Sequence, residues 1–140
     1  FRGRTESEIR EQLGRIIRFL RLYGKGGEWV TFSRAEPNMM KGIIFRPDYG
    51  EFGIKNLKRL ACLAPGCTVN VFENRKVIKK LKLYMPPKIY NFDDIECSNP
   101  DCISNHEQGE NIPAEFHKTA DDRFVCKYCE KIHTFMEIWK

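Results

Sequence analysis

The sequence predicts an α+β domain, built from a small mixed sheet and two helices, followed by a small all-β domain that folds around a metal ion. Three features predict this. Apolar residues recur at helical spacing near the N-terminus, an alternating hairpin lies mid-chain, and four paired cysteines lie near the C-terminus. We expect residues 1–85 to form the first domain, residues 86–91 a proline-rich linker, and residues 92–140 the second domain.

The first helix is predicted to begin at Thr5. In Thr5-Glu6-Ser7-Glu8 the threonine hydroxyl can accept from the Glu8 N–H while the Glu8 carboxylate reaches back to the Thr5 N–H, which is a capping box. The apolar residues that follow share one helical face: Ile9, Leu13, Ile16, Ile17 and Leu20. Gly24 is predicted to end this helix. No strand is expected before the helix.

Two strands follow, and a second helix comes after them. Residues 28–33 (EWVTFS) and 42–46 (GIIFR) have the composition of strands. A turn is predicted at residues 47–50. Residues 54–62 (IKNLKRLAC) are predicted to be helical, with an inward face formed by Ile54, Leu57, Leu60 and Ala61.

A β-hairpin is predicted to complete the first domain. Residues 68–73 (TVNVFE) alternate with period two, Asn74-Arg75 form the turn, and residues 76–83 (KVIKKLKL) return. This pairing would make part of the sheet antiparallel. The consecutive prolines Pro86 and Pro87 cannot continue a ladder, so the linker is expected there.

Four cysteines near the C-terminus predict a zinc site. Cys97 and Cys102 are spaced C-x4-C, Cys126 and Cys129 are spaced C-x2-C, and 23 residues separate the two pairs. Two short-spaced pairs can bring four thiolates to one tetrahedral Zn²⁺ ion. Four thiolates complete the coordination shell, so a structural zinc ion is expected, one per chain. A segment this short rarely buries enough apolar surface to fold unaided.

The remaining cysteines and the histidines have simpler interpretations. Cys62 and Cys67 also lie five apart, but an apolar segment separates them and no partner pair remains, so buried thiols are expected. The three histidines are expected on the surface or in the core rather than as ligands: His106, His117 and His133. No arrangement of nucleophile, base and orienting group is apparent, so catalysis by this chain is not expected.

The composition of the chain favours a globular protein. It has 140 residues with 41% hydrophobic content, and no apolar run approaches membrane-spanning length, so a cytoplasmic protein with no membrane contact is expected. The net charge of +5 suggests nucleic-acid binding. Much of the positive charge, however, lies on one face of the first helix and on one strand, as in ordinary solvated surfaces.

Several motifs together resemble the regulatory chain of aspartate carbamoyltransferase. They are Thr68-Val69-Asn70 with its hairpin, the Pro-Pro pair, Cys97-x4-Cys102-Ile103-Ser104, and Cys126-Lys127-Tyr128-Cys129-Glu130. The resemblance covers roughly residues 42–130. It implies a non-catalytic regulatory subunit of aspartate carbamoyltransferase, an enzyme of pyrimidine biosynthesis, that takes part in allosteric regulation. Its zinc domain would dock on the catalytic chain, and the subunit could also associate with another regulatory chain.

The resemblance also implies an effector site in the first domain. Asn70 would hydrogen-bond a base or ribose, Phe72 and Val77 would form an apolar wall, and Lys80 and Arg59 would contact phosphates. The N-terminal segment departs from the family pattern, and Glu6 and Glu8 would repel a triphosphate, so weak nucleotide binding is expected.

The loop after Cys102 is expected to meet the catalytic chain through four residues: Asn105, Glu107, Asn111 and Glu115.

Two other hypotheses differ from a free regulatory subunit. One is a nucleic-acid-binding zinc ribbon in which basic residues of the first domain meet phosphates: Arg15, Arg18, Lys79 and Lys82. The acidic segment between the cysteine pairs counts against it, and no nucleic-acid partner is expected. The other is a regulatory segment of a longer polypeptide that also carries a catalytic domain, which would explain why the chain begins with Phe1.

Overall fold

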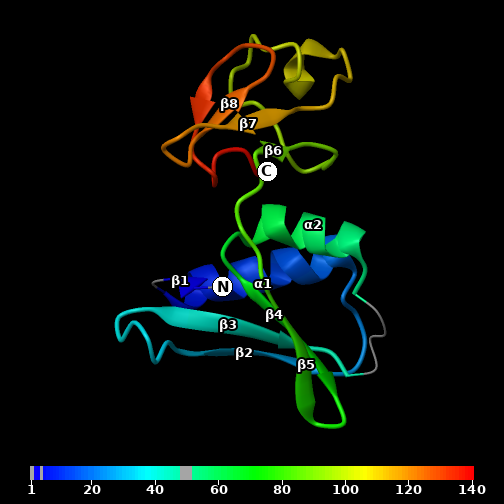
Figure 1. The fold of residues 1–140 in the computed structure, drawn as a ribbon. Coiled ribbons are helices and arrows are strands. Elements are labelled where there is room, and N and C mark those ends of the chain that lie inside the picture. Colours follow the sequence, from blue (N-terminus) through cyan, green and yellow to red (C-terminus); the bar gives the residue numbers. More distant parts are fainter. Residues whose placement is uncertain (1, 4, 48–51) are drawn as a thin grey trace. The chain divides into compact units, whose positions relative to one another are not determined.

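The computed structural model describes residues 2–3, 5–47 and 52–140 (Figure 1). The chain divides into two compact units, Phe1–Met85 and Pro86–Lys140. The turn expected at residues 47–50 lies outside the described residues from position 48 onward.

The helix α1 spans Glu6–Leu20 and begins with the capping box that the sequence predicts. Glu8 N–H donates to the Thr5 hydroxyl at 3.2 Å, and Thr5 N–H donates to the Glu8 carboxylate at 3.1 Å. The helix ends earlier than expected. Arg21, not Gly24, closes it in the left-handed conformation, with φ of 52°. Of the helix residues, the buried ones are Ile9, Leu13, Ile16 and Leu20.

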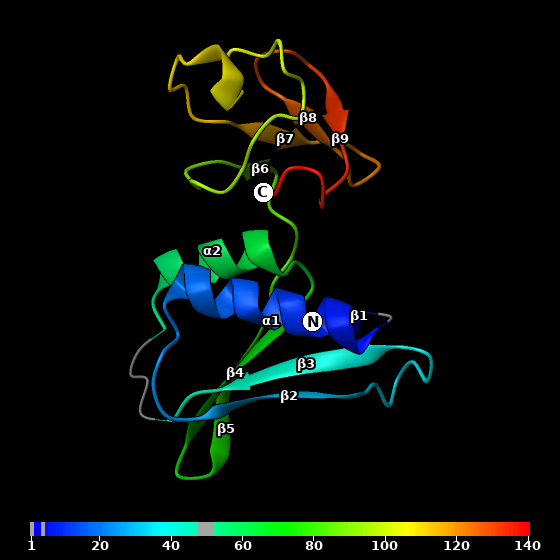
Figure 2. The same cartoon turned by 180° about the vertical axis from the view of Figure 1, so that it is seen from behind.

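Helix α1 lies between a three-stranded sheet and helix α2, which spans Ile54–Leu63 (Figures 1 and 2). The sheet order is β1-β3-β2, formed by Arg2–Gly3, Met40–Phe45 and Gly27–Phe32. The expectation of no strand before α1 is therefore wrong, because β1 pairs with β3. In α2 the burial falls on Cys62 and Leu63, whereas Ile54, expected inward, is 69% exposed.

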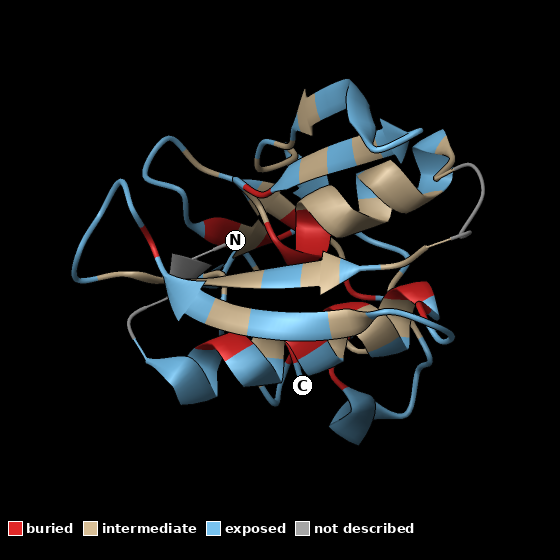
Figure 3. Ribbon diagram, turned by 90° about the horizontal axis from the view of Figure 1, so that it is seen from below, coloured by how far each residue is buried: buried red, intermediate tan, exposed pale blue. Residues whose placement is uncertain are grey.

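The face of the sheet away from α1 carries exposed apolar side chains. Trp29 and Ile43 are cross-strand partners, and the rings of Trp29 and Phe45 lie 6.3 Å apart between centroids. All three side chains are more than 40% exposed. Figure 3 shows that neither β2 nor β3 contains a buried residue. The core of the first unit thus lies on the helical side of the sheet.

Strands β4 (Thr68–Glu73) and β5 (Lys76–Lys82) form the expected hairpin as a separate two-stranded sheet. Asn74 and Arg75 both have positive φ, of 48° and 64°, as the predicted two-residue turn requires. Every strand pairing among the described residues is antiparallel. The prediction of a mixed sheet is therefore wrong, because no parallel pair occurs among these strands. The α+β class is confirmed.

The second unit is built on a four-stranded sheet with the order β6-β7-β8-β9. The strands are short and span Lys88–Ile89, Phe116–Lys118, Phe124–Cys126 and Ile132–His133. A short 3₁₀ helix, η1, spans His106–Gln108, and Ile95 forms an isolated bridge with Trp139. The buried core includes Phe116, Phe124 and Ile138.

The segment at residues 86–91, expected to be a linker, carries strand β6. Ile89 is fully buried there, and Lys118 N–H donates to Pro87 O at 2.8 Å. On the other side of the prolines, Leu83 N–H donates to Cys67 O at 2.9 Å, and Gly66 N–H donates to Leu83 O at 2.7 Å. Only residues 84–86 separate these two anchored positions.

We predict that alanine at Gly26 destabilises the first unit more than alanine at Gly24. Both glycines have φ near 130°, at 130° and 124°, where alanine costs about 1–3 kcal/mol. A Cβ at Gly26 would also overlap with Phe45 O, whereas no described atom lies within 4 Å of a Cβ at Gly24. Chemical denaturation should give a loss roughly 2 kcal/mol larger for Gly26→Ala than for Gly24→Ala. Equal losses would contradict this packing of Gly26 against β3.

Candidate metal centre

The four cysteines of the second unit converge from two loops. Cys97 and Cys102 lie in the loop between Ile95 and η1, whereas Cys126 ends β8 and Cys129 lies in the turn before β9. The four Sγ atoms all lie within 4.8 Å of one another. Cys97, Cys102 and Cys126 are buried, and Cys129 is half-buried.

The sulfur separations fit a tetrahedral ion. Cys97 Sγ lies 3.5 Å from Cys129 Sγ, and Cys102 Sγ lies 3.7 Å from Cys126 Sγ. Metal–sulfur bonds of about 2.3 Å at tetrahedral angles require sulfurs about 3.8 Å apart. Both short contacts join one loop to the other, so an ion held there would bridge the loops. The cluster has the donors and spacing of a closed, structural metal site.

Backbone hydrogen bonds shape both cysteine loops. In the first loop Cys102 N–H donates to Asn99 O at 3.0 Å. In the second, Glu130 N–H donates to Cys126 O and Cys126 N–H donates to Lys131 O, both at 3.0 Å, with Glu130 at φ 62°. These tight turns aim successive N–H groups at the sulfurs, and this is the local reason that the short cysteine spacings work.

The cluster holds its thiols in unlike environments. Burial raises the pKa of Cys97 and of Cys126. Backbone N–H groups partly offset this rise: that of Asn99 donates to the Cys97 sulfur, and those of Cys129 and Tyr128 donate to the Cys126 sulfur. Burial also raises the pKa of Cys129, but hydrogen bonds outweigh it and bring that pKa down to about 7. They come from the Lys131 N–H, the Asn99 side chain and the thiols of Cys97 and Cys102. Cys129 is therefore the thiol that ionises most readily of these three.

Two side chains that sequence reasoning did not assign to the site support the cysteine loops. Asn105 is buried, and its amide donates to Cys97 O at 2.8 Å. His133 is 1% exposed, with Nε2 3.2 Å from Ser98 N and Nδ1 3.0 Å from Lys131 O. Burial lowers the pKa of His133. Asn105 lies three residues after Cys102 and His133 lies four residues after Cys129, and this nearness in sequence was the only available sign of a role at the site. It does not reveal which backbone groups the two side chains contact.

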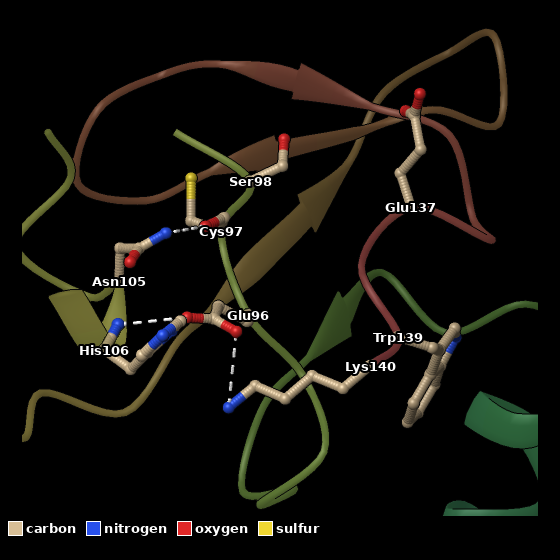
Figure 4. Close-up of a pocket in the computed structure, with 8 residues that line it drawn as sticks. All are labelled: Glu96, Cys97, Ser98, Asn105, His106, Glu137, Trp139 and Lys140. Carbon is tan, nitrogen blue, oxygen red and sulfur yellow. Dashed lines mark hydrogen bonds and ion pairs between the residues drawn. The ribbon is translucent and has the colours of Figure 1, made fainter. Parts of the chain in front are cut away.

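The group of four cysteines contains no histidine, so the expectation that the histidines are not ligands stays a prediction. His106 pairs through Nδ1 with Glu96 at a small pocket of about 180 Å³ (Figure 4). Lys140 Nζ lies 3.4 Å from the other Glu96 oxygen. Burial raises the pKa of Glu96, but hydrogen bonds from His106 and the charge of Lys140 outweigh it and lower that pKa.

The loop residues expected to meet a partner differ in exposure. Asn105 is buried and engaged within the loop, so it is not available for an intermolecular contact. The Glu115 side chain is only 18% exposed and pairs with Lys127 at 3.0 Å and with His117 at 2.9 Å. Glu107 and Asn111 are exposed.

The predicted effector residues lie on two elements. Asn70 pairs with Lys80, and Phe72 pairs with Val77, across the β4–β5 hairpin. Asn70 and Phe72 alternate along β4 and so share a face, and their partners Lys80 and Val77 share it across a register shift at Val71/Phe72. All four side chains are exposed. Arg59 lies on α2 and is half-buried.

The two cysteines of the first unit are buried thiols, as expected. Burial raises the pKa of Cys62 to about 11, partly offset by the charge of Arg59. Burial also raises the pKa of Cys67. Neither residue belongs to a metal-binding group among the described residues.

Two family models match the chain in succession. Residues 9–84 match "Aspartate carbamoyltransferase regulatory chain, allosteric domain". Residues 87–139 match "Aspartate carbamoyltransferase regulatory chain, metal binding domain", the segment that holds the four cysteines.

Similar proteins carry related names. The chain is 46% identical over 139 residues to Protein PyrBI of Treponema denticola, and 36% identical over 138 residues to Protein PyrBI of Thermotoga maritima. Each match covers 99% of this chain and 26% of the relative, so the chain spans about a quarter of their length. It is 47% identical to the aspartate carbamoyltransferase regulatory chain of Vibrio parahaemolyticus over 74 residues, which are 53% of this chain and 47% of that one.

No helix within the described ranges is long and apolar enough to cross a membrane.

We predict that metal binding at the cysteine cluster strengthens as pH rises. The raised pKa values of Cys97 and Cys126 keep these thiols protonated near neutral pH, and a metal ion must displace their protons. Competition titrations with a chelator between pH 6 and 8 should show about two or more protons released per ion. An affinity that does not change with pH would contradict this account.

Proposed function

The chain belongs to the aspartate carbamoyltransferase regulatory-chain family, and from this membership we propose that it is a non-catalytic regulatory part of aspartate carbamoyltransferase in pyrimidine biosynthesis. The observation that carries the proposal is the pair of family matches, to an allosteric domain over residues 9–84 and to a metal binding domain over residues 87–139, the segment that contains the four cysteines. The relatives named PyrBI are about four times as long as this chain, which supports a regulatory segment within a longer polypeptide.

The proposed metal is Zn²⁺, one ion per chain, with Cys97, Cys102, Cys126 and Cys129 as ligands. A set of four thiolates in tetrahedral geometry suits zinc. When bound, the ion would supply folding free energy by joining the two cysteine loops, with no open position for chemistry. This chain's own contribution is the pair of tight turns that aim backbone N–H groups at the sulfurs.

The proposed partner of the second unit is the aspartate carbamoyltransferase catalytic chain. The second unit offers exposed polar side chains beside the metal loops, including Glu107 and Asn111. Loops fixed by a metal lose little conformational freedom when they bind, which favours association. Charged side chains at such a surface would set orientation and association rate more than affinity. Catalysis is proposed to belong to that partner, and the cytoplasm is the proposed location.

The proposed effector surface is the exposed face of the β4–β5 hairpin, with Asn70, Phe72, Val77 and Lys80, together with Arg59 of α2. An amide, two apolar side chains and a lysine on one face suit the base, ribose and phosphates of a nucleotide. Both Glu6 and Glu8 are held in α1, where Glu6 pairs with Arg10 and Glu8 completes the capping box. Nucleotide binding is proposed to be weak, and a second regulatory chain is proposed as a further partner.

The nucleic-acid-binding alternative is not favoured. Both family models describe a regulatory chain. Arg15, one of the basic residues of that hypothesis, has a side chain only 10% exposed and pairs with Glu11. It is therefore poorly placed to meet a phosphate backbone.

We expect that removing zinc from the purified assembly releases the catalytic chain. A zinc-releasing mercurial reacts with thiolates, so the two cysteine loops lose their bridge and the docking surface with it. Size-exclusion chromatography should show co-elution before treatment and separation after it. The control is zinc repletion after removal of the mercurial with excess thiol, which should restore co-elution. A complex that persists after metal analysis shows no zinc would refute the proposed docking role.

We also expect that Lys80→Ala weakens nucleoside triphosphate binding while Lys79→Ala does not. Lys80 shares the hairpin face of Asn70, whereas Lys79 pairs with Val71 on the opposite face, so the two changes remove the same charge from different sides. Calorimetry should show several-fold weaker binding for Lys80→Ala only. Equal effects of both changes would indicate long-range attraction in place of a site on that face.

A further inference from the structure

His133 joins the two cysteine loops through hydrogen bonds. It lies at the end of β9, four residues beyond Cys129, and its imidazole is almost completely buried, at 1% exposure. Nε2 lies 3.2 Å from the backbone nitrogen of Ser98, the residue directly after Cys97. Nδ1 lies 3.0 Å from Lys131 O, two residues after Cys129. One side chain thus contacts the backbone of both loops.

These two contacts determine the protonation of the ring. The Ser98 backbone N–H can only donate, so Nε2 must accept and carries no proton. The Lys131 carbonyl oxygen can only accept, so Nδ1 must carry the proton. The ring is therefore the neutral Nδ1–H tautomer, with each nitrogen satisfied by one backbone group. Its Nε2 also lies 3.7 Å from Cys97 Sγ, so the ring packs directly beside one sulfur of the cluster.

Packing holds the ring in this orientation. The His133 and Phe116 rings meet edge to face, with centroids 5.2 Å apart, and Phe116 is fully buried. Phe124, the cross-strand partner of His133 in the β8–β9 pair, is also fully buried. The imidazole therefore sits among apolar side chains, where a phenyl ring would fill similar space but would leave the Ser98 N–H without its acceptor.

We propose that His133 is a positioning residue of the metal centre, which fixes the loop of Cys97 against the loop of Cys129 and so sets the separation of their sulfurs. This inference rests on the proposed zinc site. The Cys97–Cys129 contact of 3.5 Å is one of the two that join the loops, and His133 spans the same two loops beside it. Residues that orient metal ligands commonly change metal affinity 10–100-fold when they are replaced.

The test compares zinc affinity of the full chain in three variants, by competition with a chelator of known affinity. His133→Phe keeps the ring packed against Phe116 but removes both hydrogen bonds, and zinc affinity should fall by about 10-fold or more. His133→Gln returns an acceptor for the Ser98 N–H and should recover part of that loss. His117→Phe makes the same change at a half-exposed histidine of β7, and it should leave affinity unchanged.

Cobalt substitution gives a readout that loss of stability alone would not move. The absorption bands of Co²⁺ bound to four thiolates report the geometry of the sulfurs. These bands should shift in His133→Phe and not in His117→Phe. Unchanged zinc affinity together with unchanged cobalt bands in His133→Phe would overturn the inference. A wild-type chain that binds no zinc would instead refute the proposed metal.

A measurement on the unmodified chain keeps the inference testable if His133→Phe does not fold. Long-range ¹H–¹⁵N correlation spectra of the zinc-loaded protein should show His133 protonated on Nδ1, with scalar coupling between Nε2 and the Ser98 amide nitrogen. A proton on Nε2 would overturn the inference, because the hydrogen bond from Ser98 could not then exist.

Discussion

The convergence of four sulfurs from two loops is the constraint on which the second unit depends. Its strands have only two or three residues each, too few for a sheet of this size to be stable through backbone pairing alone. Both short sulfur contacts join one loop to the other, and the fully buried Cys97 and Cys126 lie in the same core as Phe116 and Phe124. The metal site and the hydrophobic core are therefore one structure.

The first unit depends on a different arrangement. Helix α1 packs against both the three-stranded sheet and α2, and it contributes four buried residues to the core of this unit: Ile9, Leu13, Ile16 and Leu20. The opposite face of the sheet keeps Trp29, Ile43 and Phe45 exposed. Folding of this unit therefore rests on apolar burial on one side of its sheet, without cross-links or metal ligands among its described residues.

Sequence predicted those features that local chemistry determines. The capping box at Thr5, the turn at Asn74-Arg75 and the cysteine spacings each follow from a few adjacent residues. It failed where tertiary contacts decide. Strand β1 has two residues and forms only because β3 is available beside it. Ile54 fits a helical apolar pattern, yet the buried residues of α2 lie at the opposite end of the helix. His133 and Asn105 contact the cysteine loops through the fold, which no spacing rule indicates.

The position of β6 also determines how many backbone torsions connect the two units. Leu83 is held to the first unit and Pro87 to the second by backbone hydrogen bonds, which leaves only Tyr84, Met85 and Pro86 between them. The rings of both prolines fix φ, and each proline restricts the residue before it to extended conformations. The segment between these two anchored positions therefore has few backbone torsions that can rotate freely.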